Sequence, residues 1–296
     1  MIKYRSLTII IGTFLLLTFI GCDEKNIDTS KKETDSKVIT DSISNGDYVQ
    51  FGRYDDEPIL WKCVDTANGA MLVSEYILTL KAFSAAQSGV VAPPGGSLTV
   101  DESGNIIRDT TADLRQMYGS NEWHNSNLRE WLNSDSKVVN YTTQPPIKEA
   151  VYEGYNPYAD ESGFLTNFTE SEKKKIKEVT HDAVKDRVYI LSKDEVNKYI
   201  GSTPNERKKH MVYEVDEDVS LDYECYKIRV RNIWWYWTRT PSTESSFAVF
   251  FVNDNGNLHS AIGACIGKVG VVPALNLHPV IPISGNGTKE EPYILQ

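Results

Sequence analysis

The chain contains few cysteines: four in 296 residues, of which only Cys63, Cys225 and Cys265 lie beyond the N-terminal segment. None of them forms the Cys-x-x-Cys spacing of a zinc or redox site, and three thiols allow at most one disulfide. A disulfide scaffold is therefore not expected, and buried free thiols are favoured over a bridge. Whether Cys225 and Cys265 pair stays open. Cys63 shares an expected strand face with Ile59 and Trp61, which suits a small buried hydrophobic residue.

An excess of basic charge is also absent. The chain carries 31 basic and 41 acidic residues, a net charge of −10. Removing residues 1–21 takes away Lys3 and Arg5, which lowers the net charge to −12. This balance argues against nucleic acid as a partner and against an electrostatic attachment to anionic lipid.

Recognisable catalytic motifs are missing as well. The sequence has no Gly-x-Ser-x-Gly elbow and no glycine-rich phosphate loop. Its five histidines show neither i, i+4 pairing nor clustering. The abundant carboxylates leave a glycosidase-like pair open, but no spacing marks one. We therefore predict no catalytic residue, no metal ligand set and no cofactor.

The longest apolar run, residues 7–20, is short. At about 1.5 Å per residue its 14 residues span only ~21 Å, less than the ~30 Å of a bilayer core. A basic start at Lys3 and Arg5 precedes the run, and the small residue Gly21 follows it. This arrangement is typical of a secretory signal rather than a permanent membrane helix.

The residues after this run sharpen the interpretation. Phe19-Ile-Gly-Cys22 resembles the bacterial lipobox. The resemblance implies cleavage between Gly21 and Cys22 and a diacylglycerol on the Cys22 thiol. Phe19 stands where leucine is usual, so an uncleaved anchor remains the alternative. We expect a lipoprotein held to the bacterial cell membrane by Cys22 and facing the extracytoplasmic space, because two acyl chains suffice for stable attachment.

Four segments are expected. Residues 1–21 form the signal peptide and 22–45 a disordered tether, which is polar, lacks aromatic residues and has a reach of roughly 25 Å. Residues 46–283 form one domain, and 284–296 form a C-terminal tail.

Within the domain, short helices are expected between hairpins, which indicates an α+β fold with antiparallel strands and long loops. A helix is predicted over 127–133, and capping boxes at Thr169–Glu172 and Ser192–Glu195 begin helices that run to about Val179 and to Gly201. Asn68-Gly69 predicts a type I′ turn. Long loops cover 84–120 and 142–167. The predicted strands are 48–51, 59–64, 70–73, 186–191, 234–237, 247–252 and 269–277.

Six segments, in this order, resemble an uncharacterised family of bacterial surface-protein domains of unknown function. They are Asp47-Tyr-Val-Gln-Phe-Gly52, Trp123-His-Asn-Ser-Asn-Leu-Arg-Glu-Trp-Leu-Asn133, Phe168-Thr-Glu-Ser-Glu172, Val188-Tyr-Ile-Leu-Ser192, Tyr236-Trp-Thr-Arg-Thr-Pro241 and Gly270-Val-Val-Pro-Ala-Leu275. The family is similar to the C-type-lectin-like fold and, distantly, to formylglycine-generating domains. The resemblance implies that fold and a surface location, but no activity.

The chain departs from these relatives in informative ways. Val272 stands where the family usually has arginine. The close cysteine pair of formylglycine-generating enzymes is absent, and so are the Glu-Pro-Asn and Gln-Pro-Asp tripeptides of calcium-dependent lectins. Asn253, Asp254 and Asn255 offer oxygen atoms for a weak calcium site, although a β-turn explains them better.

The strongest candidate for a binding surface is Trp234-Trp-Tyr-Trp237. In a strand, Trp235 and Trp237 would share one face and Trp234 and Tyr236 the other. Packing into the core is the favoured interpretation. In the functional alternative, one face is a platform on which a sugar or peptide stacks. The residues assigned to that ligand site are Trp234, Tyr236, Arg239, Tyr152, Tyr155 and Tyr158.

The leading hypothesis is a lipid-anchored binding or adhesion module for an extracellular glycan or surface protein. One alternative is an extracytoplasmic enzyme that acts on cell wall or polysaccharide. A second alternative is a passive structural lipoprotein of the envelope.

Overall fold

Alternating burial along the second strand shows how the first sheet is built. Ile59, Trp61 and Cys63 are buried, as the sequence predicted, while Leu60 and Lys62 are partly exposed. The computed structural model describes residues 43–91, 112–181, 183–212, 220–223, 226–229, 232–279 and 284–295. The signal peptide, Cys22, nearly all of the tether, Cys225 and much of the 84–120 loop lie outside these ranges.

The first sheet contains seven strands in the order β18-β1-β2-β3-β17-β5, and β8 also pairs with β17. The C-terminal strand β18 pairs parallel to β1, whereas the other pairs are antiparallel. The strands are β1 (Tyr48–Tyr54), β2 (Glu57–Asp65), β3 (Met71–Ser74), β5 (Ile176–Lys177), β8 (Val188–Ile190), β17 (Pro273–Leu277) and β18 (Tyr293–Ile294).

The second sheet contains five strands in the order β15-β14-β13-β16-β4. Here β13 and β16 are parallel. The strands are β4 (Thr79–Leu80), β13 (Tyr236–Pro241), β14 (Ala248–Val252), β15 (Leu258–Gly263) and β16 (Gly270–Val271).

Consecutive strands lie in different sheets where the chain passes from β3 to β4 and from β16 to β17. The strand predicted over 269–277 is therefore two strands: β16 belongs to the second sheet and β17 to the first. Val272 separates them, and Pro273 then begins β17. The connection between β3 and β4 is joined to β16 by a backbone hydrogen bond of 3.0 Å, which the Leu78 N–H donates to the Val271 carbonyl.

Short hairpins and helices complete the domain. The two-stranded sheets pair β6 (Val179–His181) with β7 (Val184–Asp186), β9 (Lys209–His210) with β12 (Ile233–Trp234), and β10 (Ser220–Tyr223) with β11 (Tyr226–Arg229). The α-helices are α1 (Ala112–Tyr118), α2 (Asn127–Asn133), α3 (Glu170–Lys173), α4 (Lys193–Glu195) and α5 (Pro204–Arg207). The remaining helical turns are η1 (Trp123–Asn125), η2 (Lys148–Ala150), η3 (Tyr152–Gly154), η4 (Phe164–Asn167) and the π-helical η5 (Val196–Ile200).

Both predicted capping boxes are confirmed. The Thr169 and Ser192 hydroxyls each accept a backbone N–H, and the Glu172 and Glu195 carboxylates accept the backbone N–H groups of Thr169 and Ser192. The helix predicted to reach Val179 is wrong, because α3 ends at Lys173 and Ile176 enters the first sheet. A cap starts a helix, but this sequence has too few apolar positions at helical spacing to continue it.

The connection between β2 and β3 also differs from the sequence-based prediction. Gly69 has a positive φ of 94°, but Asn68 does not, so the turn is not type I′. Instead, five residues separate the strands and the register shifts between Cys63 and Asp65. The predicted α+β class with mainly antiparallel strands and few short helices is confirmed.

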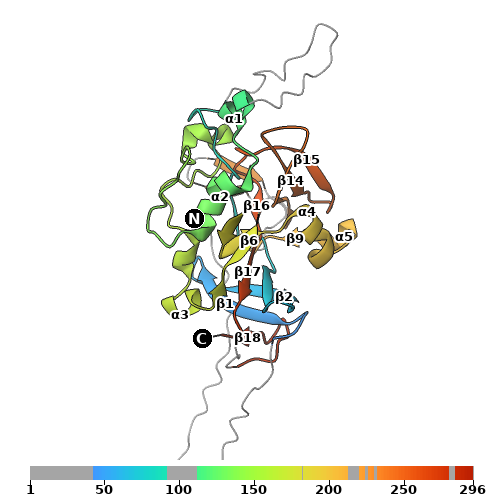
Figure 1. Cartoon of the computed structure of the whole chain (residues 1–296). Helices are drawn as coiled ribbons and strands as arrows, with labels where there is room; N and C mark the ends of the chain where they lie inside the picture. The colour runs from blue at the N-terminus through green and yellow to red at the C-terminus, as the bar shows by residue number, and fades with distance from the viewer. Residues whose placement is uncertain are drawn as a thin grey trace, which may run out of the picture. The chain divides into compact units, whose positions relative to one another are not determined.

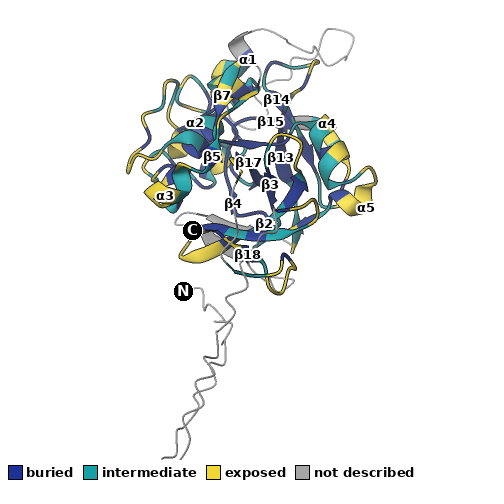
Figure 2. Ribbon diagram, turned by 60° about the horizontal axis from the view of Figure 1, so that its bottom comes forward, coloured by how far each residue is buried: buried dark blue, intermediate teal, exposed yellow. Residues whose placement is uncertain are grey.

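The core lies between and around the two sheets, where the strands are mainly buried (Figure 2). Four of the six tryptophans are at most 2% exposed: Trp61, Trp123, Trp131 and Trp237. Strands β1 and β18 lie at one end of the domain and α1 at the other (Figure 1). The first strand of the described chain and helix α1 therefore lie at opposite ends of the domain.

Candidate functional site

The predicted aromatic strand is interrupted at Trp235, which lies between β12 and β13. Instead of alternating, the rings of Trp234 and Trp235 stack, with centroids 5.6 Å apart and an interplanar angle of 13°. Trp235 also contacts the buried Phe251 ring at 5.5 Å. The expected alternation over 234–237 is therefore wrong, because β12 and β13 pair with different sheets.

The irregular stretch around Tyr155 meets this tryptophan pair through the segment that precedes β16. The Trp234 indole donates a hydrogen bond to the carbonyl of Lys268 at 2.8 Å, and the Lys268 ammonium lies 5.4 Å from the centre of the Tyr155 ring. Gly267 permits this approach, since a Cβ there would lie 1.9 Å from the Tyr155 carbonyl oxygen. Residues more than 70 positions apart in the chain thus share one surface.

We call Trp234, Trp235, Tyr155 and Lys268 the aromatic strip. All four are partly exposed. Trp235 and Lys268 were not among the predicted site residues. The aromatic character of Trp235 is the only signal in the sequence that pointed to it, and none pointed to Lys268. Trp235 Nε1 is buried without a hydrogen-bond partner. Tyr152 lies beside the same segment, because its N–H donates to the Cys265 carbonyl at 2.9 Å.

The other three predicted site residues are buried. The Tyr236 hydroxyl donates to the Arg207 carbonyl and the Tyr158 hydroxyl to the Ala82 carbonyl, both at 2.7 Å. Burial raises the pKa of both phenols. Tyr236 and Tyr158 are therefore held inside the domain and not on an open platform.

Arg239 is occupied by a bidentate ion pair. Its guanidinium binds both carboxylate oxygens of Glu195, one at 2.9 Å, and also donates to the Ile190 carbonyl at 3.0 Å. Burial by itself would raise the pKa of Glu195, but the hydrogen bonds and positive charge of Arg239 outweigh it and lower that pKa. The pair joins α4 to β13.

Asn253 and its neighbours form a turn. The Asn253 side-chain oxygen accepts the N–H groups of Asn255 at 3.0 Å and Asn257 at 2.9 Å. Gly256 has a φ of 82° and lies so close to the Pro204 carbonyl that a Cβ would clash with it. The preferred turn interpretation is confirmed, and the calcium site at Asn253, Asp254 and Asn255 stays a prediction.

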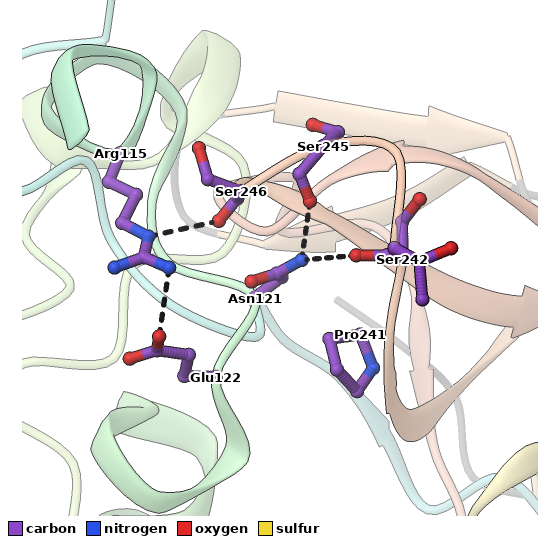
Figure 3. Close-up of a pocket in the computed structure, with 8 residues that line it drawn as sticks. Arg115, Asn121, Glu122, Pro241, Ser242, Ser245 and Ser246 are labelled. Atoms are coloured by element: carbon purple, nitrogen blue, oxygen red, sulfur yellow. Dashed lines mark hydrogen bonds and ion pairs between the residues drawn. The ribbon is translucent and has the colours of Figure 1, made fainter. Parts of the chain in front are cut away.

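A polar pocket, which we call the polar depression, lies between α1 and the loop that joins β13 to β14 (Figure 3). Its volume is about 290 Å³. It is lined by Arg115, Asn121, Glu122, Pro241, Ser242, Thr243, Ser245 and Ser246. None of these residues was predicted, because the two segments are separated by more than 110 residues and no motif marks either one.

Asn121 holds the loop of the polar depression in place. Its amide nitrogen donates to the carbonyls of Ser242, Ser245 and Ala248 at 3.2, 2.6 and 3.0 Å. Arg115 Nε donates to the Ser246 carbonyl at 3.3 Å, and its Nη2 pairs with Glu122 Oε1 at 2.8 Å (Figure 3). The backbone carbonyls of the loop are therefore turned toward α1 and its following segment.

Burial governs the two cysteines that the structure describes. Cys63 and Cys265 are buried free cysteines, and burial raises the pKa of the Cys63 thiol to about 11 and that of Cys265 to about 12. Among the described residues, no group of three or more His, Cys, Asp and Glu is arranged to hold a metal ion. Across the same ranges, no helix has the length and apolar character needed to cross a bilayer.

Comparison with known proteins identifies one family. A family model described as a domain of unknown function (DUF6273) matches residues 68–279, which is more than two thirds of the chain. The matched region includes both the aromatic strip and the polar depression. No curated protein and no solved structure matches the chain.

Proposed function

The chain belongs to the DUF6273 family, and we propose that it is a lipid-anchored extracytoplasmic binding or adhesion module for an extracellular glycan or surface protein. The finer features of this proposal are a C-type-lectin-like fold for the domain and attachment to the bacterial cell membrane through Cys22. The mixed sheets and the long irregular stretch between α2 and α3 support that fold assignment.

The observation that carries the binding role is the aromatic strip. Four tryptophans are buried, and the two that retain exposed surface stack on each other next to a tyrosine and a lysine. Exposed aromatic surface with polar groups at its edge is the composition typical of binding sites, because flat rings supply contact area at little entropic cost. A sugar ring or a peptide side chain that stacks on Trp234 would use this surface.

Binding can be tested with the secreted mature chain on a glycan array and in cell-wall pull-downs. Trp234→Ala should weaken binding at least tenfold, because a truncated central aromatic typically costs about 2 kcal/mol or more. Tyr199→Ala, which truncates a partly buried aromatic outside the strip, is the matched control and should bind normally. Hydrolysis of a polysaccharide without stable binding to any partner would replace this proposal with the enzyme alternative.

The anchor is tested separately by metabolic labelling with a fatty acid. The native chain should incorporate label and Cys22→Ala should not. Equal labelling of the two chains, or none in either, would contradict attachment at Cys22.

A further inference from the structure

We propose that the polar depression is a binding site for a neutral polyhydroxylated ligand, namely a single sugar residue. This inference rests on the proposed glycan-binding function and adds a second, chemically defined contact to it. The aromatic strip contributes no residue to the depression.

The first step of the argument is the supply of unused hydrogen-bonding atoms. Asn121 is only 3% exposed and its amide nitrogen is fully engaged, yet its amide oxygen makes no hydrogen bond within the described chain. Arg115 Nη1 and the Thr243 hydroxyl likewise have no partner there. The Arg115 side chain is 30% exposed and Thr243 is exposed, so these groups face solvent in the depression, where a polar ligand can take the place of water.

The second step is the alternation of donors and acceptors. Glu122 Oε1 accepts from Arg115, while Oε2 lies 3.8 Å from His124 Nε2 and can accept a further hydrogen bond. The Ser242 and Ser245 hydroxyls accept backbone N–H groups at 3.2 and 3.3 Å, so each can still donate its own proton. Each hydroxyl of a sugar both donates and accepts, and a ring carries several of them side by side. Such a ligand satisfies the lining as a set, which a simple cation or anion would not.

Charge and size point the same way. The only full charges in the lining are Arg115 and Glu122, which form a pair and leave the depression without net charge. A volume of about 290 Å³ is at the lower limit of small-molecule pockets, which begin at about 300 Å³. The depression therefore suits one uncharged ring rather than an extended chain.

The rigidity and position of the depression also favour recognition. Asn121 pins the loop before any ligand arrives, which reduces the ordering cost of binding. The depression borders α1, at the end of the domain opposite to β1 and β18 (Figure 1). This end therefore lies away from β1, the first strand of the described chain.

The test uses the full chain in a zwitterionic detergent that contains no sugar. Saturation-transfer NMR with the methyl glycosides of glucose, galactose, mannose and N-acetylglucosamine identifies which ring binds. Glu122→Gln should lower the affinity for the glycoside about tenfold, because a hydrogen bond to a charged acceptor is exchanged for one to a neutral acceptor. Thr243→Val should weaken it by roughly threefold, and Thr180→Val, an exposed control in β6, should leave it unchanged.

Three outcomes are decisive. Loss of glycoside binding in Glu122→Gln and Thr243→Val, with normal binding in Thr180→Val, supports the site. If glycosides bind, Trp234→Ala abolishes that binding and both depression variants behave as wild type, this inference is wrong and the proposed function stands. If no glycoside binds, this inference is wrong, and if the glycan array and the cell-wall pull-downs are also negative, the proposed function falls with it.

Discussion

Lys81 and Lys268 each lie against aromatic rings, in opposite settings. The ammonium of Lys81 lies 4.5 Å from the Trp131 ring centre and 4.6 Å from that of Tyr158, and its side chain is 1% exposed. Its partner is Glu161 Oε2 at 2.5 Å. Lys268 lies over Tyr155 beside Trp234, but these residues keep part of their surface in solvent.

The same residue types therefore do different work because of burial. Around Lys81 every face is covered and burial lowers the pKa of the ammonium, against the opposing pull of Glu161. This cluster links α2 and the irregular stretch after it to the core, since Trp131 also donates to the Ser162 carbonyl at 2.9 Å. Around Lys268 the aromatic rings keep part of their surface in solvent, which the proposed binding role would use. We expect changes in the first region to lower stability and changes in the second to lower binding.

The largest expected effect is that of Trp131→Ala. Removing this fully buried ring leaves a cavity and should lower the free energy of unfolding by about 3–5 kcal/mol. Trp234→Ala, which removes the same side chain from the strip, should cost clearly less because that ring is partly exposed. Urea denaturation of both variants measures this difference. Equal losses of unfolding free energy in the two variants would contradict the contrast between the buried and the exposed region.

Arg239→Met comes next. Arg239 was assigned to the ligand site, but its bidentate pair with Glu195 makes it structural, so removal should cost about 3 kcal/mol by leaving Glu195 without its charge partner. Binding per folded molecule should be unchanged. A variant with normal stability and lost binding would return Arg239 to the ligand site.

A smaller effect comes from Lys209, which is buried against the Ser74 and Glu75 carbonyls. Burial lowers the pKa of Lys209 to about 8 from its usual value of 10.5. Below pH 8 Lys209 is protonated in both the folded and the unfolded state, and the burial of its charged ammonium destabilises the folded state. As the pH rises through 8 the folded state loses the proton first, so stability should rise by about 1 kcal/mol between pH 7 and 9.

Lys209→Met should remove this rise, because methionine has no proton to release. Thermal unfolding of the wild type and the variant across pH 7–9 provides the comparison. Parallel curves for the two proteins would show that Lys209 titrates normally in the folded state.

The smallest expected effect is that of Lys268→Met. A partly exposed cation over an aromatic ring contributes about 0.5–1 kcal/mol, so the loss of stability should not exceed that range. Glycan binding should fall, while Lys198→Met, in which an exposed lysine also lies over a tyrosine ring, serves as the control and should not change it. A loss of stability as large as that of Trp131→Ala would show that Lys268, like Lys81, has a structural role.

Several features could be read from the sequence because neighbouring residues decide them. The capping boxes at Thr169 and Ser192 require only residues three positions apart, and both are present. The alternating burial of β2 likewise follows from its own pattern. The acidic composition and the lack of metal and nucleotide motifs also belong to the sequence itself.

Only the tertiary structure decided which aromatic residues remain exposed. Trp234 and Trp237 lie three residues apart in one aromatic segment whose exposed face the sequence did not reveal, yet Trp237 donates to the Lys81 carbonyl inside the core while Trp234 meets Lys268 at the surface. The polar depression similarly combines α1 with a loop more than a hundred residues away. Burial depends on what long-range partners cover, because a side chain buried by a distant strand leaves no trace in its own neighbours. Local pattern therefore determined the helix starts and the burial along β2, and long-range packing determined where several elements end and which surfaces remain exposed.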